Sequence, residues 1–227
     1  MDRTVFKKKI LIACSMIEDE INAVFDRFDV GDVEIWWQER GHHNDPDKLR
    51  IVIQNKIEEA EAAGADLVML AYGLCGNGAI GWRTGSAVLA MPRFDDCINI
   101  MLCPEKRDRR NYEEPGNMYI TKGWIRDEGA LLSMLERSIS RHGERRGRRA
   151  MKLMFDSYRK VTVIDTGCYD LRPVCEYADK CREETGLEPC VVPGSNLVLE
   201  KLITCRWDGD ILVKKPGERV AGADFEF

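Results

Sequence analysis

Three cysteines stand where a parallel α/β fold gathers its reactive groups. Cys14 ends an apolar run, Cys75 lies in a glycine-rich segment after a second run, and Cys97 follows a third. Thiolate sulfur is both a nucleophile and a ligand for zinc and iron. Each cysteine also precedes or begins an expected helix, a position that lowers a thiol's pKa. The pattern predicts that these three thiols converge on one metal centre.

Two of the three histidines, His42 and His43, precede a helix expected to begin after Asp45. His43 with two thiolates would suit zinc, whose usual ligands are sulfur and imidazole. A different hypothesis makes Cys75 a covalent nucleophile with His43 as its base. The alternative to both is that the cysteines pack as small apolar groups and that the histidines lie in a solvent-facing turn.

The segment 73–81 holds four glycines directly after the most convincing buried strand. It matches neither a phosphate-binding Walker loop nor a dinucleotide fingerprint. We expect at least one residue of this loop at positive φ, because glycine and asparagine tolerate that region best. Its backbone would then hold an anion or a cofactor, or simply form a tight turn. The expected cofactor-binding residues are Gly73, Gly76, Asn77 and Gly78.

Two carboxylates, Asp95 and Asp96, precede Cys97. Either could cap the helix that follows, and either could carry protons for the chemistry of the site. They are the expected catalytic residues.

The composition excludes several classes of protein. The chain is 44% hydrophobic and 32% charged, which is typical of a globular protein. A net charge of −5 argues against general nucleic-acid binding, and no apolar stretch approaches the roughly 20 residues that span a bilayer. Nine cysteines, an odd number, indicate a reducing compartment rather than a disulfide scaffold. We therefore expect a cytoplasmic protein that acts on a small molecule, without nucleic acid or membrane as partner.

Short apolar runs alternate with amphipathic stretches, which predicts an α/β fold of two packed Rossmann-like halves with mainly parallel sheet. The expected halves are residues 1–126, with the cysteines and the glycine loop, and residues 127–227, which close the cleft. Ser15 to Glu18 matches a capping box and predicts a helix start. The expected strands cover residues 9–14, 33–37, 65–72, 87–91, 118–120, 160–165, 189–192 and 211–213.

In the second half, only Cys168 has a loop setting like that of Cys14. The basic run 141–149 indicates either an anionic partner or the solvated face of a helix.

Five ordered strings resemble one family. They are ACSMIEDE (13–20), HNDPDKLR (43–50), YGLCGNG (72–78), PRFDDCI (92–98) and YITKGWI (119–125). On these strings, over about residues 9–205, the chain is similar to the domain of unknown function 1638 family. The resemblance brings no established reaction. It implies a cytosolic prokaryotic protein, often encoded near corrinoid-dependent methyltransferases, and hence an association with one-carbon or corrinoid metabolism.

Two functions follow as hypotheses. The first is a metal-thiolate enzyme in which Cys14, Cys75 and Cys97, or two of them with His43, hold a [4Fe-4S] cluster or zinc. It would act on a small thiol, methyl or one-carbon substrate. The second is a non-enzymatic accessory protein that binds a corrinoid or metal for a corrinoid methyltransferase system. The second function needs no acid–base group, so turnover by the isolated protein separates the two.

Overall fold

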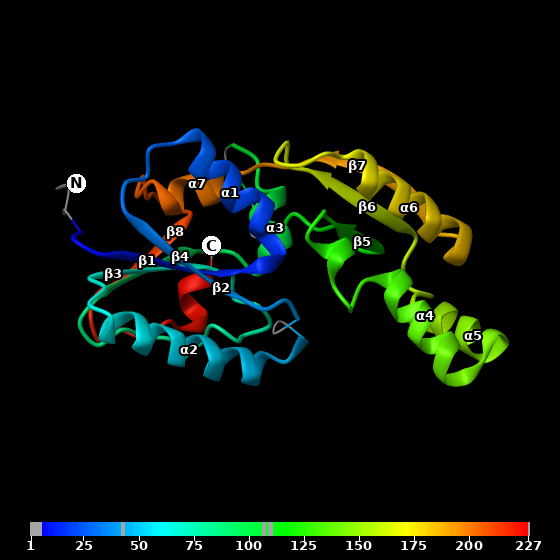
Figure 1. The fold of residues 1–227 in the computed structure, drawn as a ribbon, viewed down its shortest axis with the longest axis horizontal. Coiled ribbons are helices and arrows are strands. Elements are labelled where there is room, and N and C mark those ends of the chain that lie inside the picture. The colour runs from blue at the N-terminus through cyan, green and yellow to red at the C-terminus, as the bar shows by residue number, and fades with distance from the viewer. Residues whose placement is uncertain (1–5, 42–43, 106–107, 109–110, 227) are drawn as a thin grey trace.

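The computed structural model describes residues 6–41, 44–105, 108 and 111–226, and it has an α/β fold with two sheets (Figure 1). The larger sheet has the order β2-β1-β3-β4-β8, with β1 (Lys9–Cys14), β2 (Val33–Gln38), β3 (Leu67–Ala71), β4 (Val88–Pro92) and β8 (Ile211–Lys214). The smaller sheet has the order β5-β6-β7, with β5 (Asn117–Ile120), β6 (Lys160–Asp165) and β7 (Glu188–Pro193). All neighbouring strands are parallel except β8, which runs antiparallel to β4. The predicted fold class is confirmed.

Helices cover both faces of the larger sheet. The α-helices of both sheets together are α1 (Glu18–Arg27), α2 (Pro46–Ala62), α3 (Cys97–Leu102), α4 (Leu131–His142), α5 (Glu144–Met154), α6 (Arg172–Thr185) and α7 (Leu197–Ile203). Alternate residues of β1 point to opposite faces, so Ile10 and Ile12 pack with α2 while Leu11 and Ala13 pack with α1 and α7. Within the described ranges, no helix is both long and apolar enough to cross a membrane.

The predicted capping box at Ser15 is wrong. Residues Ser15–Ile17 form a 3₁₀ turn, and Ile17 occupies the N-cap position of α1 without a side-chain cap. The Ser15 hydroxyl donates instead to the carbonyl oxygen of Gln38 at 2.9 Å. Because Gln38 pairs with Cys14 in the sheet, this bond joins the carboxyl ends of β1 and β2. The Ser15 hydroxyl therefore bonds a residue that is distant in the sequence instead of capping its own helix.

The two sheets do not follow the expected halves of the chain. Strand β5 precedes residue 127 but belongs to the smaller sheet, and β8 returns from the end of the chain to pair with β4. Helix α7 also packs on the larger sheet, where Val198 and Leu199 are fully buried. The chain thus crosses twice between the two layers of structure.

The carboxyl ends of the parallel strands in the two sheets meet at one junction, beside α3 (Figure 1). The turn after β5 lies on the turn after β1, so closely that a Cβ on Gly123 would be 1.8 Å from the Met16 carbonyl oxygen. The loop after β7 reaches α3, where Ser195 N donates to Met101 O at 2.7 Å. Ligands of α/β proteins bind outside the carboxyl ends of strands, and here two such edges share one junction.

Candidate functional site

The three predicted thiols lie at the junction end of the larger sheet. Cys14 is the last residue of β1, Cys75 lies in the loop after β3, and Cys97 begins α3 after β4. Since β1, β3 and β4 are parallel neighbours, their carboxyl ends bring the cysteines to one edge. Burial raises the pKa of Cys97 most, and Asp96 and both other thiols raise it further, so the three thiols are close enough to interact electrostatically.

The expected lowering of thiol pKa values is wrong. Burial raises the pKa of Cys75 to about 12 and raises those of Cys14 and Cys97. Loss of solvation outweighs the backbone hydrogen bonds at the loop and helix starts. The thiols are therefore protonated at neutral pH in the ligand-free protein. A nearby cation, such as a bound metal ion, would be needed to hold them as thiolates.

In the part of the chain that the structure describes, no group of three His, Cys, Asp or Glu side chains is arranged to hold a metal ion. His43, the predicted imidazole ligand, lies outside the described residues. The predicted set of metal ligands therefore stays a prediction.

The glycine loop is held in a left-handed backbone conformation. Cys75, Gly76 and Asn77 have φ values of 47°, 64° and 72°, which confirms the expected positive φ. A non-glycine residue in this region costs free energy and persists only where its surroundings impose it. Here Cys75 N donates to the Asp95 carbonyl oxygen at 2.7 Å.

The glycine loop also needs Gly73 for its close approach to α3. A Cβ on Gly73 would lie 2.7 Å from the Cα atom of Asp96. The next residue continues the contact, because Leu74 N donates to Phe94 O at 2.8 Å. The loops that carry Cys75 and Cys97 are thus one hydrogen-bonded unit.

Asp96, one of the two predicted catalytic carboxylates, caps α3. Its Oδ1 accepts from Asn99 N at 2.8 Å and from Asn99 Nδ2 at 3.1 Å. The same amide donates to Glu113 Oε1 at 2.8 Å. Burial and the neighbouring Asp96 raise the pKa of Glu113 to about 7. The structure therefore adds Glu113 to Asp96 as a carboxyl pair that can exchange a proton beside Cys97.

A buried carboxyl group that the sequence analysis missed lies between the sheets. Glu20 of α1 is 1% exposed, and its Oε1 accepts from the Thr166 hydroxyl, after β6, at 3.1 Å. Burial raises its pKa to about 7. Helical phase could have revealed it, because Glu20 follows Ile17 by three residues and precedes Val24 by four, on the buried face of α1.

Several buried polar atoms at this junction have no hydrogen-bond partner within the described residues. They include Glu20 Oε2, Arg40 Nε, Tyr72 Oη and Thr121 Oγ1. Tyr72 and Arg40 both interact electrostatically with Cys14, while Thr121 follows β5 directly. Native proteins satisfy nearly all such groups, so these polar atoms are available to a ligand or to ordered water.

The sequence profile of a family described as "Protein of unknown function (DUF1638)" matches residues 37–203. The chain belongs to this family. The matched DUF1638 segment contains Cys75 and Cys97 with their connected loops, whereas Cys14 and Glu20 precede it. No curated protein and no solved structure matches the chain significantly.

A polar cavity of about 440 Å³ adjoins the junction in this DUF1638 protein. It is lined by Thr166 and Cys168 after β6, by Ser195 and Asn196 after β7, and by Arg27 of α1. The Asn196 amide donates to the Glu20 carbonyl oxygen at 2.8 Å. The cavity therefore borders the helix that carries the buried carboxyl group, at the carboxyl edge of the smaller sheet.

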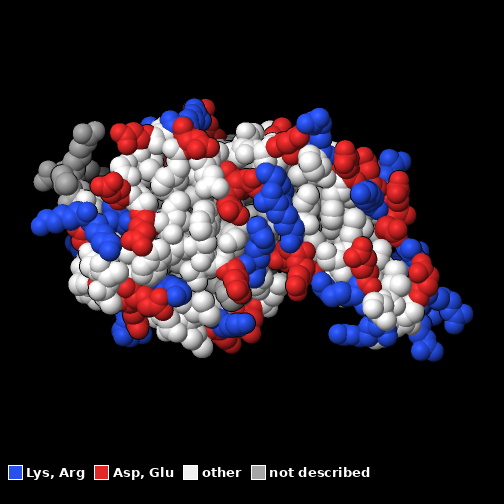
Figure 2. All heavy atoms as spheres, viewed as in Figure 1, with Lys and Arg blue, Asp and Glu red and all other residues white. Residues whose placement is uncertain are grey.

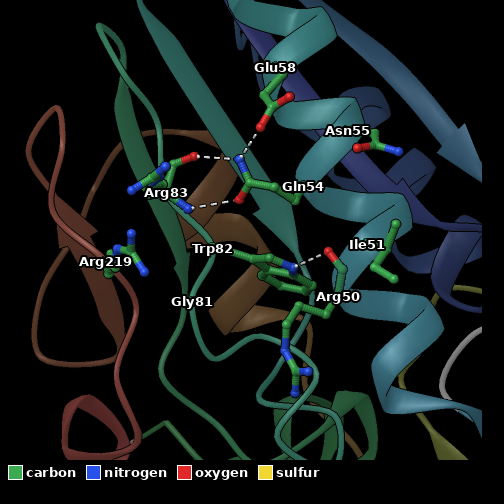
Figure 3. A pocket seen from close by; sticks show the side chains of 9 residues that line it. All are labelled: Arg50, Ile51, Gln54, Asn55, Glu58, Gly81, Trp82, Arg83 and Arg219. Atoms are coloured by element: carbon green, nitrogen blue, oxygen red, sulfur yellow. Dashed lines mark hydrogen bonds between the residues drawn. The ribbon is translucent and has the colours of Figure 1, made fainter.

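A second cavity, of about 370 Å³, lies between α2 and the segment 81–83, and none of the predicted site residues lines it (Figure 3). Polar side chains of this cavity join α2 to the segment 81–83. The Gln54 amide donates to Arg83 O and accepts from Arg83 N, both at 3.1 Å, and Trp82 Nε1 donates to Arg50 O at 3.1 Å. The guanidinium groups of Arg83 and Arg219 edge this cavity. We assign it no catalytic role.

Replacing Glu20 by glutamine is expected to stabilise the ligand-free protein at pH 8 by about 1–3 kcal/mol and to change little at pH 5. Because the pKa of Glu20 is raised from 4.5 to about 7, the folded state loses stability as the pH rises through this interval. Glutamine stays neutral and removes that loss. Urea unfolding at both pH values measures the effect, with exposed Glu183→Gln as the control. Equal shifts in both variants would contradict it.

Proposed function

We propose that this protein holds a metal centre on Cys14, Cys75 and Cys97 and uses it to bind and activate a small thiol or one-carbon substrate. One observation carries the proposal. Three half-buried cysteines lie at one edge of the larger sheet, and burial together with all three thiols raises the pKa of Tyr72, whose buried hydroxyl has no partner in the described structure. A bound metal cation would hold the three thiols as thiolates, and a thiolate would in turn accept a hydrogen bond from the Tyr72 hydroxyl.

The donor set favours a soft metal. Thiolate ligands select zinc or iron–sulfur clusters over magnesium or calcium. Three thiolates suit a cubane cluster with one open iron, whereas two thiolates with His43 suit zinc. Thiolates on one zinc ion lie about 3.8 Å apart, against about 6–7 Å for the ligands of a cubane. The cluster and the zinc ion therefore differ in the spacing of thiolates that they need, and metal analysis decides between them. When bound, either centre would act as a Lewis acid toward a substrate sulfur or oxygen.

The residues around the thiols have separate roles in this proposal. The Tyr72 hydroxyl donates a hydrogen bond to a ligand sulfur, which lowers the charge that the buried site must hold. The Glu113 carboxyl group, whose pKa is raised to about 7 by burial and by the neighbouring Asp96, passes a proton to or from the substrate. Asp95 holds Cys75 in place through its carbonyl oxygen. The Asp96–Glu113 pair makes an enzyme a better interpretation than an accessory protein.

The polar cavity at the edge of the smaller sheet would admit the substrate to the junction, although none of the three thiols lines it. Its lining offers hydroxyl and amide groups that can bind a small polar molecule, while the Arg27 guanidinium pairs with Glu200 of the same lining at 2.9 Å. Two other arginines do not line this cavity. Arg172 is exposed and pairs with Asp170 at 2.7 Å, and Arg93 donates to the carbonyl oxygens of Asp224 and Glu226. These two arginines are therefore engaged in other contacts.

Anaerobic purification followed by iron, sulfide and zinc analysis with an absorption spectrum tests the proposal. We expect about four irons and four sulfides per chain with broad absorption near 400 nm, or about one zinc for the mononuclear alternative. Protein that stays metal-free after anaerobic reconstitution with iron and sulfide, and after addition of zinc, contradicts the proposal. Metal retention without turnover of small thiols or methyl donors would favour the accessory function.

A further inference from the structure

A basic helical hairpin extends from the smaller sheet (Figure 1). Helices α4 and α5 are joined by Gly143, whose φ is 78°. They touch at Gly147, where a Cβ would lie 2.7 Å from the Cα atom of Ile139. The Ser138 hydroxyl donates to the Gly147 carbonyl oxygen at 3.3 Å. The two helices therefore pack in direct backbone contact, which fixes the position of α5 against α4.

The hairpin carries a charge opposite to that of the whole chain. Residues 131–154 contain seven Lys and Arg and two Glu, although the chain has a net charge of −5. Of these basic side chains, only Arg148 forms an ion pair in the described structure, with Glu144 and Glu184. The others are exposed: Arg137, Arg141, Arg145, Arg146, Arg149 and Lys152. Figure 2 shows basic side chains around uncharged surface at this end of the molecule. Such a concentration of like charge attracts an acidic partner.

A groove of about 230 Å³ lies between the two helices. Methionines line it, with Met134 on α4 and Met151 and Met154 on α5, and Arg137 and Arg141 stand at its edge. Met154 is 60% exposed and its neighbour Leu153 is 69% exposed. Methionine adapts its shape to apolar partners and is common at protein-binding surfaces.

We propose that the methionine groove between α4 and α5 binds an acidic amphipathic helix of a partner protein. Apolar side chains at helical spacing would enter the groove, and carboxylates beside them would pair with Arg137 and Arg141. The combination of groove and charge decides the class of partner. A nucleic acid binds through its phosphate backbone, which makes no favourable contact with an apolar methionine groove. The net negative charge of the remaining chain also repels the phosphates. A lipid surface needs a broader apolar face than Leu153 and Met154 provide.

Fluorescence anisotropy with a labelled 18-residue peptide tests this proposal. The peptide has leucines at i, i+3, i+4 and i+7 spacing and glutamates on the flanking positions. We expect salt-dependent binding that Arg137→Glu with Arg141→Glu weakens at least about tenfold. Met154→Ser should weaken it several-fold while leaving the charge unchanged. The matched control is Arg83→Glu with Arg219→Glu, which changes the charge equally at the other cavity (Figure 3) and should leave binding within about twofold.

Any of the following outcomes would overturn the proposal. The peptide fails to bind, or it binds equally to both double variants. A peptide with glutamine in place of glutamate binds as tightly as the acidic one. A 20-nucleotide single-stranded RNA, or vesicles with phosphatidylserine, bind the hairpin more tightly than the peptide. The protein forms dimers in light scattering that the Arg137→Glu, Arg141→Glu variant abolishes, which would make a second copy the partner.

Discussion

Replacing Gly123 by alanine is expected to lower the free energy of unfolding by about 3 kcal/mol or more. The added Cβ would lie 1.8 Å from the Met16 carbonyl oxygen. No side-chain rotation relieves a contact with backbone, so the turns after β1 and β5 must move apart. For a chain of this length the melting temperature should fall by roughly 6–12 °C, measured by circular dichroism or calorimetry.

Gly209→Ala is the matched control, because its Cβ would meet no atom within 4 Å. We expect its unfolding free energy to stay within about 0.5 kcal/mol of the unchanged protein. If Gly123→Ala melts at the same temperature as this control, the two sheet edges are not in the contact described here. Under the proposed function, Gly123→Ala should also lose metal, since the junction holds the site.

Replacing Cys75 or Cys97 by serine is expected to reduce bound metal at least about tenfold after anaerobic reconstitution. Serine keeps the size of the side chain, but its hydroxyl does not ionise to replace a thiolate. Cys14→Ser should lose metal as well, because its thiol belongs to the same electrostatic group. Metal and sulfide analysis, normalised to protein, measures the effect.

Cys175→Ser is the control for these variants, because Cys175 lies in α6 and is not among the groups that shift the pKa values of Cys14, Cys75 and Cys97. It should keep the metal content and the melting temperature of the unchanged protein. Equal metal content in Cys75→Ser, Cys97→Ser and Cys175→Ser would show that the thiols at the junction bind none. The cysteines would then be packing residues, and the proposed function would fail.

Local sequence pattern predicted most of the elements. The runs at 9–14 and 160–165 match β1 and β6 in full, because every inner residue of these strands is buried and apolar or, for Thr162, β-branched. Helix α2 begins after Asp45 as expected, and the Asp45 side chain caps it by accepting from Lys48 N at 3.1 Å. Such features depend on residues close in the chain, which is why they can be predicted without knowing the fold.

Local pattern could not predict which strands belong to which sheet. Strand β8 joins the larger sheet beside β4, although it follows the strands of the smaller sheet in sequence. The same long-range packing turned the Ser15 hydroxyl away from a helix cap and toward Gln38. These outcomes depend on contacts between residues far apart in the chain.

The sequence by itself determined the α/β class, the positive φ of the glycine loop and the placement of Cys14, Cys75 and Cys97 at strand ends. Only the tertiary structure decided the electrostatics of the site. Burial raises the pKa values that helix starts were expected to lower. Helical phase can place Glu20 on the buried face of α1, but only the fold brings its carboxyl group against Thr166, after β6 of the other sheet. Solvation is lost through the packing of distant elements, so the protonation state of a buried group is set by the whole fold.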